Sequence, residues 1–553
     1  MIRQQVLTSL VGMFVKYLHS KGVRDSFNFV LEIPPKNINA DFAINAAMLI
    51  AKKLKTDPKI IAKEFAEIIL KEASNIIEKV EIAGNGFINL YVKNEVVYKS
   101  LKKILVEKNR YGSMPKKNNK KKVLMEFVSA NPTGPLHIGH GRGAAIGDSL
   151  ARILKYLGYN VTKEYYLNDA GNQMLVLAES TKIRYKQVTD EGIDFPVNYY
   201  QGEYIIDIAK RLFSEDRDIN KIDFKYEAVR DILKTIKDDL KNFAIEFDNW
   251  FSESEVAIVK DENGKTKIDK VCESLLHENE AYMKDGALWL SSTKFGDTKD
   301  RVLRKSNGEY TYLASDIAYH KNKFERGFTK LINLWGADHH GYVARIKACV
   351  RMLGFDGEAL HIILYQLVSL TRNGQSVTMS TRSGEFITLK EVVNEVGKDA
   401  CRFFFLLRDP NSPLEFDLEL AKKCSNENPV FYVQYVNARC NSIIREGKNR
   451  KDIISDIEAI NFSLLNTKEE RNLIKKLSAF CDTLAISEKT MSPHHFTTYL
   501  IELADIYHKF YEKCRVLTDD SNLTSARLKL IEGVMIIVKN GLNLLGVSTL
   551  DKM

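Results

Sequence analysis

Two segments of this chain follow the order strand, polar loop, helix, strand, and this order restricts the possible folds more than any other feature of the sequence. The first segment has a strand at residues 123–129, a loop at 131–140 and, after a helix, a second strand at 160–167. The other begins with a strand at 331–335, continues through a loop and a helix, and returns as a strand at 361–368. Because helical crossovers join parallel strands, two such units predict a parallel sheet of the nucleotide-binding type.

The regions around these units predict further domains, as expected for a chain of 553 residues. Helical patterns and one short extended piece predict an α+β domain at residues 1–115, and an almost purely helical pattern predicts a bundle at 426–553. Residues 168–330 are too numerous for a simple crossover, so we expect an inserted subdomain at about 170–310. The predicted fold is therefore an α/β multidomain protein whose Rossmann-like domain spans residues 116–425.

The positive charge of the chain is unevenly distributed. The 81 Lys and Arg exceed the 72 Asp and Glu, which gives a formal net charge of +9. Residues 1–122 carry +12, residues 123–425 carry −4 and residues 426–553 carry +1. Most of the surplus, +8, lies between Leu101 and Lys122, where Gly, Pro, Asn and Lys without apolar periodicity predict a solvated linker. This tract permits contact with a polyanion, and a linker explains it equally well.

The cysteines and the apolar runs bear on the compartment. Seven cysteines form no C-x-x-C pair and leave an odd number, which is typical of reduced thiols in a cytoplasmic protein without a structural zinc site. No apolar run approaches the roughly 18 residues that a membrane-spanning helix needs. We therefore expect a cytoplasmic protein with no membrane partner.

The loop before the first crossover helix carries two histidines, His137 and His140, at the start of that helix. At this spacing both imidazoles project from one side of the first turn. A helix N-terminus has unpaired backbone N–H groups and a partial positive charge, so two imidazole donors there can bind oxygens of a polyphosphate. Taken alone, the pair could also face solvent or form half of a metal site. Its position between a strand and a helix favours nucleotide binding.

The sequence around these histidines resembles a known signature. His137-Ile-Gly-His140 is similar to the HIGH sequence of class I aminoacyl-tRNA synthetases, and the longer string at 127–142 resembles that of arginyl-tRNA synthetases. Further segments that resemble the same family are 41–47, 84–89, 168–171, 336–341, 379–382 and 428–439. The first two of these resemble that family's additional tRNA-binding domain. The resemblance therefore covers nearly the whole chain.

This resemblance implies an enzyme that ligates arginine to tRNA. Arginine and ATP would give arginyl-adenylate and diphosphate, and the arginyl group would move to the 2′-hydroxyl of the terminal adenosine of arginine tRNA. His137 and His140 are implied as catalytic residues that stabilise the developing charge, with Mg²⁺ arriving together with ATP and no metal held by the protein itself. A monomer is expected, with the N-terminal domain binding tRNA and the helical bundle binding its anticodon.

A second nucleotide-binding segment of the family, KMSK in its common form, is altered here. Residues 377–382 keep Met379 and Ser380 but have threonines where the lysines would stand, and the nearest cation is Arg382. Some relatives place a lysine just before the HIGH string, but that position is Gly134. We expect Arg382, as a catalytic residue, and backbone N–H groups to hold the leaving diphosphate. The ATP-binding residues implied by the resemblance are His137, Gly139, His140, Met379 and Ser380.

Recognition of a guanidinium group should use carboxylates, because its rigid fork of donors fits them in pairs. The residues that the resemblance carries over for arginine binding are Glu126, Asn131, Tyr312, Asp316 and Asp338. Of these, Glu126, Tyr312 and Asp316 are expected at the guanidinium. The other two are expected at the α-amino group, where His339 competes with Asp338. Without the resemblance, Tyr312 and Asp316 would indicate only the exposed face of an amphipathic helix.

The predicted C-terminal helices carry aromatic and hydrogen-bonding side chains on helical spacing: Tyr432, Gln434, Tyr435 and Arg439. Such side chains can stack on unpaired anticodon bases and bond to them. The resemblance implies this tRNA-binding use, although each tyrosine could equally belong to the core of the bundle.

Two alternatives remain open from the sequence alone. A different HIGH-bearing enzyme, such as a cysteinyl-tRNA synthetase, is disfavoured by the absence of Cys and His zinc ligands and by the long N-terminal domain. A tRNA-binding relative without catalytic activity is supported by the altered segment at 377–382 and opposed by the intact His137 and His140.

Overall fold

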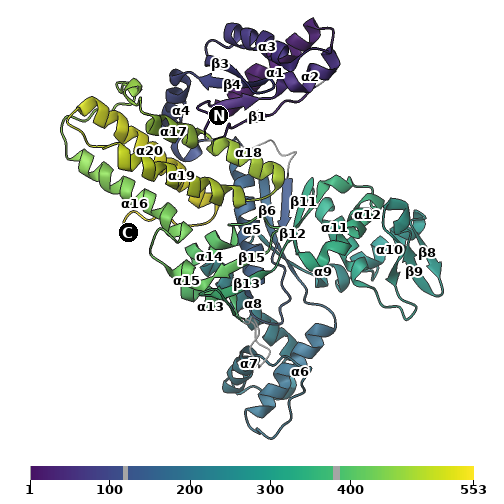
Figure 1. Cartoon of the computed structure of the whole chain (residues 1–553). Helices are drawn as coiled ribbons and strands as arrows, with labels where there is room; N and C mark the ends of the chain where they lie inside the picture. Colours follow the sequence, from purple (N-terminus) through teal and green to yellow (C-terminus); the bar gives the residue numbers. More distant parts are fainter. Residues whose placement is uncertain (1, 26, 36, 116–121, 378–386) are drawn as a thin grey trace.

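The computed structural model describes the whole chain except residues 1, 26, 36, 116–121 and 378–386. An N-terminal lobe, a central parallel sheet with two inserted lobes, and a helical C-terminal bundle are visible in Figure 1. The expected α/β multidomain architecture with a Rossmann-like sheet is thereby confirmed. Within the described parts of the chain, no helix is both long and apolar enough to span a membrane.

The N-terminal lobe packs helices against a small antiparallel sheet. Its elements are α1 (Ile2–Ser20), β1 (Leu31–Glu32), β2 (Phe42–Ile44), α2 (Ala46–Leu54), α3 (Pro58–Glu72), β3 (Ile77–Ala83), β4 (Phe87–Val92), α4 (Asn94–Glu107) and η1 (Lys108–Arg110). The strand order is β1-β2-β4-β3. The rings of Phe14 on α1 and Phe65 on α3 lie 5.2 Å apart, centre to centre, in the core of this lobe.

Both strand–loop–helix–strand units are present and contribute to one parallel sheet. Its strands and crossover helices are β5 (Lys122–Glu126), α5 (Ile138–Tyr156), β6 (Asn160–Leu167), β7 (Asn249–Ser252), β11 (Lys330–Gly336), α12 (Val343–Met352) and β12 (Leu360–Tyr365). The strand order is β12-β11-β5-β6-β7, and every neighbouring pair is parallel. The crossovers therefore diverge between β5 and β11, and such sheets bind ligands at the carboxyl ends of the strands at this point.

The first strand of the sheet is shorter than the sequence predicts. β5 ends at Glu126, whereas the apolar run predicted a strand to residue 129. Val128 (φ 68°) and Ser129 (φ 42°) adopt left-handed backbone conformations, which a strand does not accommodate. The Ser129 hydroxyl oxygen accepts the backbone N–H of Tyr166 on β6 at 3.1 Å. This bend starts the loop that carries the two histidines at the carboxyl edge of the sheet.

Two lobes are inserted between the units. The first is helical and comprises α6 (Asn172–Gln187), α7 (Glu203–Ser214), η2 (Ile219–Lys221) and α8 (Phe224–Asn242). The second comprises α9 (Ser254–Ala257), α10 (Lys267–His277), β8 (Ala281–Lys284), β9 (Ala287–Leu290), η3 (Ser292–Phe295), β10 (Arg301–Arg304) and α11 (Tyr312–Glu325). Between them the chain returns to the parallel sheet as β7. The region expected as an insertion thus contains one strand of the main sheet.

The remaining elements complete the region of the parallel sheet and the bundle. Short helices follow β11 and α12 as η4 (Ala337–Tyr342) and η5 (Gly357–Ala359). Next come β13 (Val368–Arg372), β14 (Gln375–Val377), α13 (Leu389–Val396), α14 (Lys398–Phe405), β15 (Leu414–Asp417) and α15 (Leu418–Lys422). The bundle comprises α16 (Pro429–Lys448), η6 (Phe462–Leu464), α17 (Lys468–Ser478), α18 (Phe480–Thr490), α19 (His494–Lys513) and α20 (Ser521–Leu544). Arg471 and Lys475 of α17 tie the bundle to the N-terminal lobe, because both bond to the Asp41 carboxylate at 2.7 Å.

A buried ionic cluster joins α5 to the C-terminal part of the chain. Asp148 on α5 is fully buried and accepts hydrogen bonds from Arg402 at 2.7 Å, Arg152 at 2.7 Å and Lys163 at 3.0 Å. Burial alone would raise the pKa of this carboxyl, but the three cations lower it to about 2. Arg402 is fully buried as well and also donates to the Leu545 carbonyl oxygen at 2.8 Å, just after α20.

Replacing Asp148 by Asn would leave the Arg402 guanidinium buried without a counter-charge. Breaking a buried pair from one side typically costs about 3 to 5 kcal/mol, so we expect Asp148→Asn to lower the midpoint of thermal unfolding, measured by scanning calorimetry. The matched control is Asp505→Asn, which alters an exposed pair with Lys509 on α19 (2.6 Å) and should change the midpoint little. Equal midpoints for the two variants would contradict the role of the cluster.

Candidate active site

The carboxyl edge of the parallel sheet gathers most of the residues that the sequence singled out. Glu126 is the last residue of β5. His137 is the N-cap of α5, and His140 lies in its first turn. Asp338 follows β11, and Asp316 lies on α11, which leads into β11. Residues far apart in sequence therefore meet where the crossovers diverge.

The His137 and His140 side chains stack on each other at the start of α5. Their ring centres are 3.5 Å apart with an interplanar angle of 23°. The Nδ1 atom of each ring accepts the backbone N–H of the other residue at 3.3 Å, so the hydrogen of each neutral ring lies on Nε2. Burial lowers the pKa of both imidazoles, that of His140 to about 3. Both rings are therefore neutral Nε2–H donors near pH 7.

Two glycines allow close contacts in the loop that presents these rings. A Cβ on Gly139 would lie 3.0 Å from Cε1 of His137, and one on Gly134 would lie 3.1 Å from the Tyr204 hydroxyl oxygen. Tyr204 comes from α7 in the first inserted lobe, and its hydroxyl donates to the Thr133 carbonyl oxygen. The first inserted lobe thus holds the loop in place.

Thr388 and Leu389 lie beside this loop. The backbone of His137 forms a bridge with Thr388, and the N–H of Leu389 donates to the Leu136 carbonyl oxygen at 2.7 Å. These contacts fix the start of α13 next to the histidines. The predicted residues Met379, Ser380 and Arg382 themselves lie outside the described residues.

Two acidic groups at this edge are paired with cations of the chain. The fully buried Lys323 ammonium bonds to the Glu126 carboxylate and to Asn333 Oδ1 at 3.2 Å. Nearby, the Arg326 guanidinium bonds to the Glu164 carboxylate at 2.5 and 2.9 Å. Glu126 therefore already shares its charge with Lys323 before any ligand enters.

Two other carboxyl groups form no salt bridge among the described residues. Asp316 accepts a hydrogen bond from the Tyr342 hydroxyl, and burial, with the charges of Glu126 and Glu253, raises its pKa to about 7. Glu253, directly after β7, is 6% exposed, and burial raises the pKa of this carboxyl too. Two neighbouring carboxyls whose ionised forms are disfavoured are suited to a cationic ligand, which would stabilise both.

Glu253 was not predicted as a site residue from the sequence. The strand before it, β7, has only four residues and lies inside the region that the sequence predicted as an insertion. The available signal was an acid close behind the aromatic pair Trp250-Phe251, which favours a strand.

The other residues predicted for arginine binding are more exposed. Tyr312, the first residue of α11, is 74% exposed. Asn131 is also exposed, and the side chain of Asp338 is 81% exposed with its carboxylate 3.5 Å from Nε2 of His339. These groups are accessible to a ligand, whereas Asp316 and Glu253 lie deeper.

Three of the four predicted tRNA-binding residues belong to an aromatic cluster on α16 and α19. The ring of Tyr432 lies 4.7 Å from that of His508, and the ring of Tyr435 lies 6.0 Å from it, centre to centre. The Arg439 guanidinium lies 5.6 Å from the ring centre of Tyr435 and 5.0 Å from that of Tyr511. His508 and Tyr511 come from a helix that the sequence analysis did not connect with this cluster.

Gln434, the fourth predicted residue, faces the interior instead. It is 5% exposed, and its amide donates to the Ser548 carbonyl oxygen at 2.8 Å and to the Asp399 carboxylate at 3.2 Å. These contacts anchor the C-terminal segment, so the side chain is not available to a base.

The described part of the chain contains no candidate site for a protein-bound metal ion. No group of three or more His, Cys, Asp or Glu side chains there is placed to hold an ion. The seven cysteines are all unpaired thiols.

Three family models match successive parts of the chain. The model described as the arginyl tRNA synthetase N-terminal domain matches residues 2–92. The model described as tRNA synthetases class I (R), catalytic domain, matches residues 100–408. The model described as the DALR anticodon binding domain matches residues 433–553. The second match contains the histidine pair and the carboxyl pair.

Similar proteins cover the chain from end to end. A Desulfosudis oleivorans protein named arginine–tRNA ligase is 46% identical over 533 residues, which are 95% of this chain and 94% of its own. A Citrifermentans bemidjiense protein of the same name is 46% identical over 564 residues, with 100% and 99% covered. The structure of Thermus thermophilus arginyl-tRNA synthetase matches with a TM-score of 0.75 at 20% identity and covers 100% of both chains, which shows a common fold.

Proposed function

The chain belongs to the arginyl-tRNA synthetase family and catalyses the ligation of arginine to tRNA, and from that premise we propose which side chains perform each step. The reaction uses ATP to form arginyl-adenylate with release of diphosphate. The arginyl group then passes to the 2′-hydroxyl of the terminal adenosine of arginine tRNA, and AMP leaves. The observation that carries this function is the class I catalytic match over residues 100–408.

His137 and His140 act in the first step as fixed donors. The arginine carboxylate attacks the α-phosphorus of ATP in line with the bond to diphosphate, which breaks, so the protein has to position the reactants and stabilise developing negative charge. Two neutral Nε2–H groups at the start of α5 can donate to the phosphate oxygens without giving up a proton. Gly139 supports this geometry, because a side chain there would press against the ring of His137.

Met379, Ser380 and Arg382 contact the triphosphate from the opposite side, with Arg382 as the cation on the leaving diphosphate. The bridge between His137 and Thr388 supports this assignment, since Thr388 follows Arg382 by only six residues in the sequence and lies beside the histidines. Mg²⁺ arrives on the triphosphate and lowers its negative charge. Because Mg²⁺ takes oxygen ligands whereas the histidines offer N–H donors, phosphate oxygens and water would hold the ion.

The guanidinium group of arginine is received by Asp316 and Glu253. Their support is the desolvation that raises the pKa of both carboxyls and the absence of a salt bridge to either among the described residues. Glu126, oriented by Lys323, and the exposed Tyr312 complete the side-chain pocket. Asn131 and Asp338 hold the α-amino end, where both are accessible.

The tRNA is bound by the outer parts of the chain. We divide the chain into a tRNA-binding domain at 1–115, a catalytic domain at 116–425 with an insertion at about 170–310, and an anticodon-binding domain at 426–553. Tyr432, Tyr435 and Arg439 would stack on and bond to anticodon bases, which the aromatic cluster around them supports. A cytoplasmic monomer is the proposed state, supported by the unpaired thiols for the compartment and by family resemblance for the monomer.

Removing one of the two imidazole donors should block adenylate formation. We expect His140→Ala to lower ATP–diphosphate exchange with arginine and tRNA at least 10²- to 10³-fold, the usual effect of losing one preorganised donor. Binding of arginine tRNA, measured by filter retention, should stay unchanged. Exchange at the wild-type rate would refute the role of His140.

The wild-type chain in the same assay tests the function itself. Exchange should depend on arginine and, by family precedent, on tRNA. No exchange with or without tRNA would leave a tRNA-binding relative without catalysis as the remaining interpretation. Exchange driven by cysteine would overturn the arginine assignment.

Arginine binding should strengthen as the pH rises through neutrality. The pKa of Asp316 is about 7 without ligand, and a guanidinium favours its ionised form, so binding releases a proton. The KM for arginine should therefore fall up to tenfold per pH unit below pH 7 and level off above it. Steady-state kinetics from pH 6 to 8.5 measure this dependence, which should disappear in Asp316→Asn. A wild-type KM that does not change between pH 6 and 7 would contradict the assignment.

Glu253 can be tested against a neighbour that differs in exposure. Hydrogen bonds to charged groups typically contribute about 1.5 to 3 kcal/mol, so Glu253→Gln should raise the KM for arginine about 10- to 100-fold with little change in the KM for ATP. Glu255→Gln, on the exposed side of α9, is the control and should behave like wild type. Equal arginine KM values in the two variants would exclude Glu253 from the pocket.

A further inference from the structure

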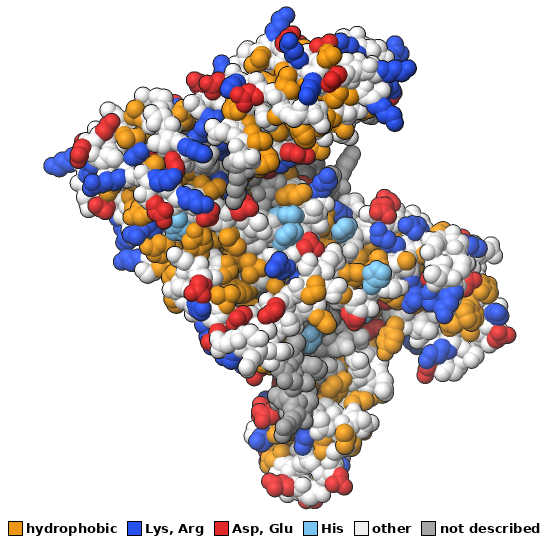
Figure 2. Space-filling view, viewed as in Figure 1, with side chains coloured by type: hydrophobic (Ala, Val, Ile, Leu, Met, Phe, Trp, Pro, Cys, Tyr) orange, Lys and Arg blue, Asp and Glu red, His pale blue; other side chains and the backbone are white. Residues whose placement is uncertain are grey.

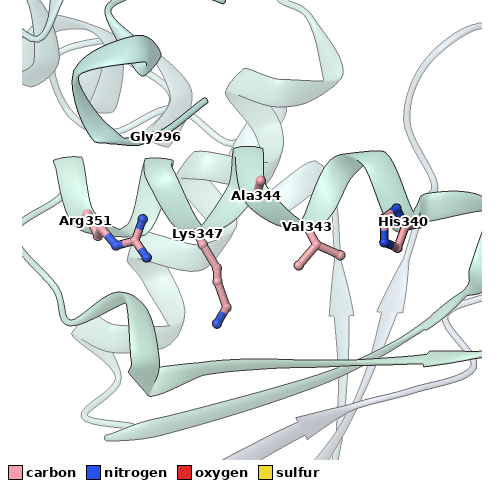
Figure 3. Close-up of a pocket in the computed structure, with 6 residues that line it drawn as sticks. All are labelled: Gly296, His340, Val343, Ala344, Lys347 and Arg351. Atoms are coloured by element: carbon pink, nitrogen blue, oxygen red, sulfur yellow. The ribbon is translucent and has the colours of Figure 1, made fainter. Parts of the chain in front are cut away.

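We propose that a basic groove along α12 binds the phosphate backbone of the unpaired 3′ end of the tRNA. The groove has a volume of about 390 Å³ and is lined by Gly296, His340, Val343, Ala344, Lys347 and Arg351 (Figure 3). The proposal rests on the ligase function proposed above and adds a surface through which the same tRNA is held.

The basic side chains of the groove come from one helix and the turn before it. Lys347 and Arg351 are four residues apart on α12, which places them about 6 Å apart along the axis. His340 precedes them in η4, and Figure 3 shows it at one end of the stretch, Arg351 at the other and Lys347 between them. Gly296 has no side chain and Ala344 only a methyl group, so a nucleic-acid strand can approach closely.

The groove carries an excess of positive charge. Among the described residues, Glu358 of η5 is the only salt-bridge partner of Lys347 (3.4 Å) and Arg351 (4.0 Å), and its side chain is 76% exposed. One carboxylate shared between two cations leaves net positive charge, and exposed pairs of this kind exchange readily for another anion. Burial, followed by the charges of Lys330 and Lys347, lowers the pKa of His361 on the adjacent β12. Lys and Arg side chains also gather on the surrounding lobe (Figure 2).

The position of the groove relates it to the reaction. His340 lies two residues after Asp338, at the carboxyl edge of the sheet where His137 begins α5. The 3′ terminal adenosine has to reach this edge to accept the arginyl group. A strand lying along α12 with its end at His340 would arrive there, and single-stranded nucleic acid is commonly guided by a basic groove that follows its phosphates.

The test removes the positive charges of Lys347 and Arg351. In Lys347→Gln/Arg351→Gln we expect the Kd for arginine tRNA, measured by filter retention, to rise about tenfold. The slope of log Kd against log salt concentration should fall by about 1.4, which is 0.7 for each of two phosphate contacts. The rate at saturating tRNA and the KM for ATP should stay at wild-type values. Lys347→Gln alone should give about half of the slope change, and it leaves the contact of Arg351 with the Phe295 carbonyl oxygen intact.

Three controls make the assignment specific. Lys265→Gln/Lys305→Gln removes two exposed, ion-paired lysines from the second inserted lobe, which contributes Gly296 to the groove, and should leave the Kd unchanged. Glu358→Gln removes the competing carboxylate and should lower the Kd two- to threefold. With tRNA from which the unpaired 3′ nucleotides have been removed, wild type and the Lys347→Gln/Arg351→Gln variant should bind equally well.

The proposal is overturned if the double variant matches the lysine control with intact tRNA, or if its defect persists with the shortened tRNA. A raised KM for ATP with an unchanged Kd for tRNA would assign the groove to a free polyphosphate instead. These outcomes are distinct from a failure of the ligase function, in which the wild-type chain itself would not attach arginine to tRNA.

Discussion

The position of α5 depends on the buried carboxylate of Asp148, and the active site depends on α5. Asp148 is surrounded by three cations, which offset the cost of taking its charge out of water. One of them, Arg402, also bonds to the carbonyl oxygens of Phe243 at 3.0 Å, at the end of α8, and of Leu545, beyond α20. A single ionic centre therefore ties the histidine-bearing helix to the first inserted lobe and to the C-terminal bundle.

A second buried cation holds the N-terminal half of the same helix. The Arg142 guanidinium is fully buried and donates to the carbonyl oxygens of Gln366 at 2.7 Å, Asp409 at 3.1 Å and Ser412 at 2.8 Å. Burial lowers its pKa to about 10, so it stays charged at neutral pH. Gln366 directly follows β12, and Asp409 and Ser412 precede β15, so Arg142 fixes the start of α5 against these two parts of the chain.

The sequence predicted those parts of the molecule that depend on local pattern. Strand and helix periodicity was sufficient to predict the two crossover units. The spacing of His137 and His140 was sufficient to predict that both side chains lie on one side of the first turn of a helix. The end of β5 at Glu126 was not predictable, because the left-handed turn after it is stabilised by the hydrogen bond that the Ser129 hydroxyl accepts from the backbone of β6. The pairing of Glu126 with Lys323, 197 positions later, is likewise a tertiary contact without a local signal. Glu253 was missed for the same reason, since its importance arises only when β7 joins the sheet.

These tertiary contacts determine which carboxylates of the proposed pocket are already paired with a cation of the chain. The catalytic region carries a formal −4 between residues 123 and 425, but at the carboxyl edge Glu126 and Glu164 are already balanced by Lys323 and Arg326. Asp316 and its neighbour Glu253 form no such salt bridge among the described residues. A guanidinium can bond to two carboxylates at once through its planar fork, whereas an ammonium is a point charge that leaves one of them unsatisfied in a low-dielectric site. Hydrogen-bonding pockets of this kind discriminate by about 10⁴ to 10⁵ without a separate editing step, so in the proposed pocket the internal neutralisation of Glu126 and Glu164 would leave two carboxyls to select arginine over lysine.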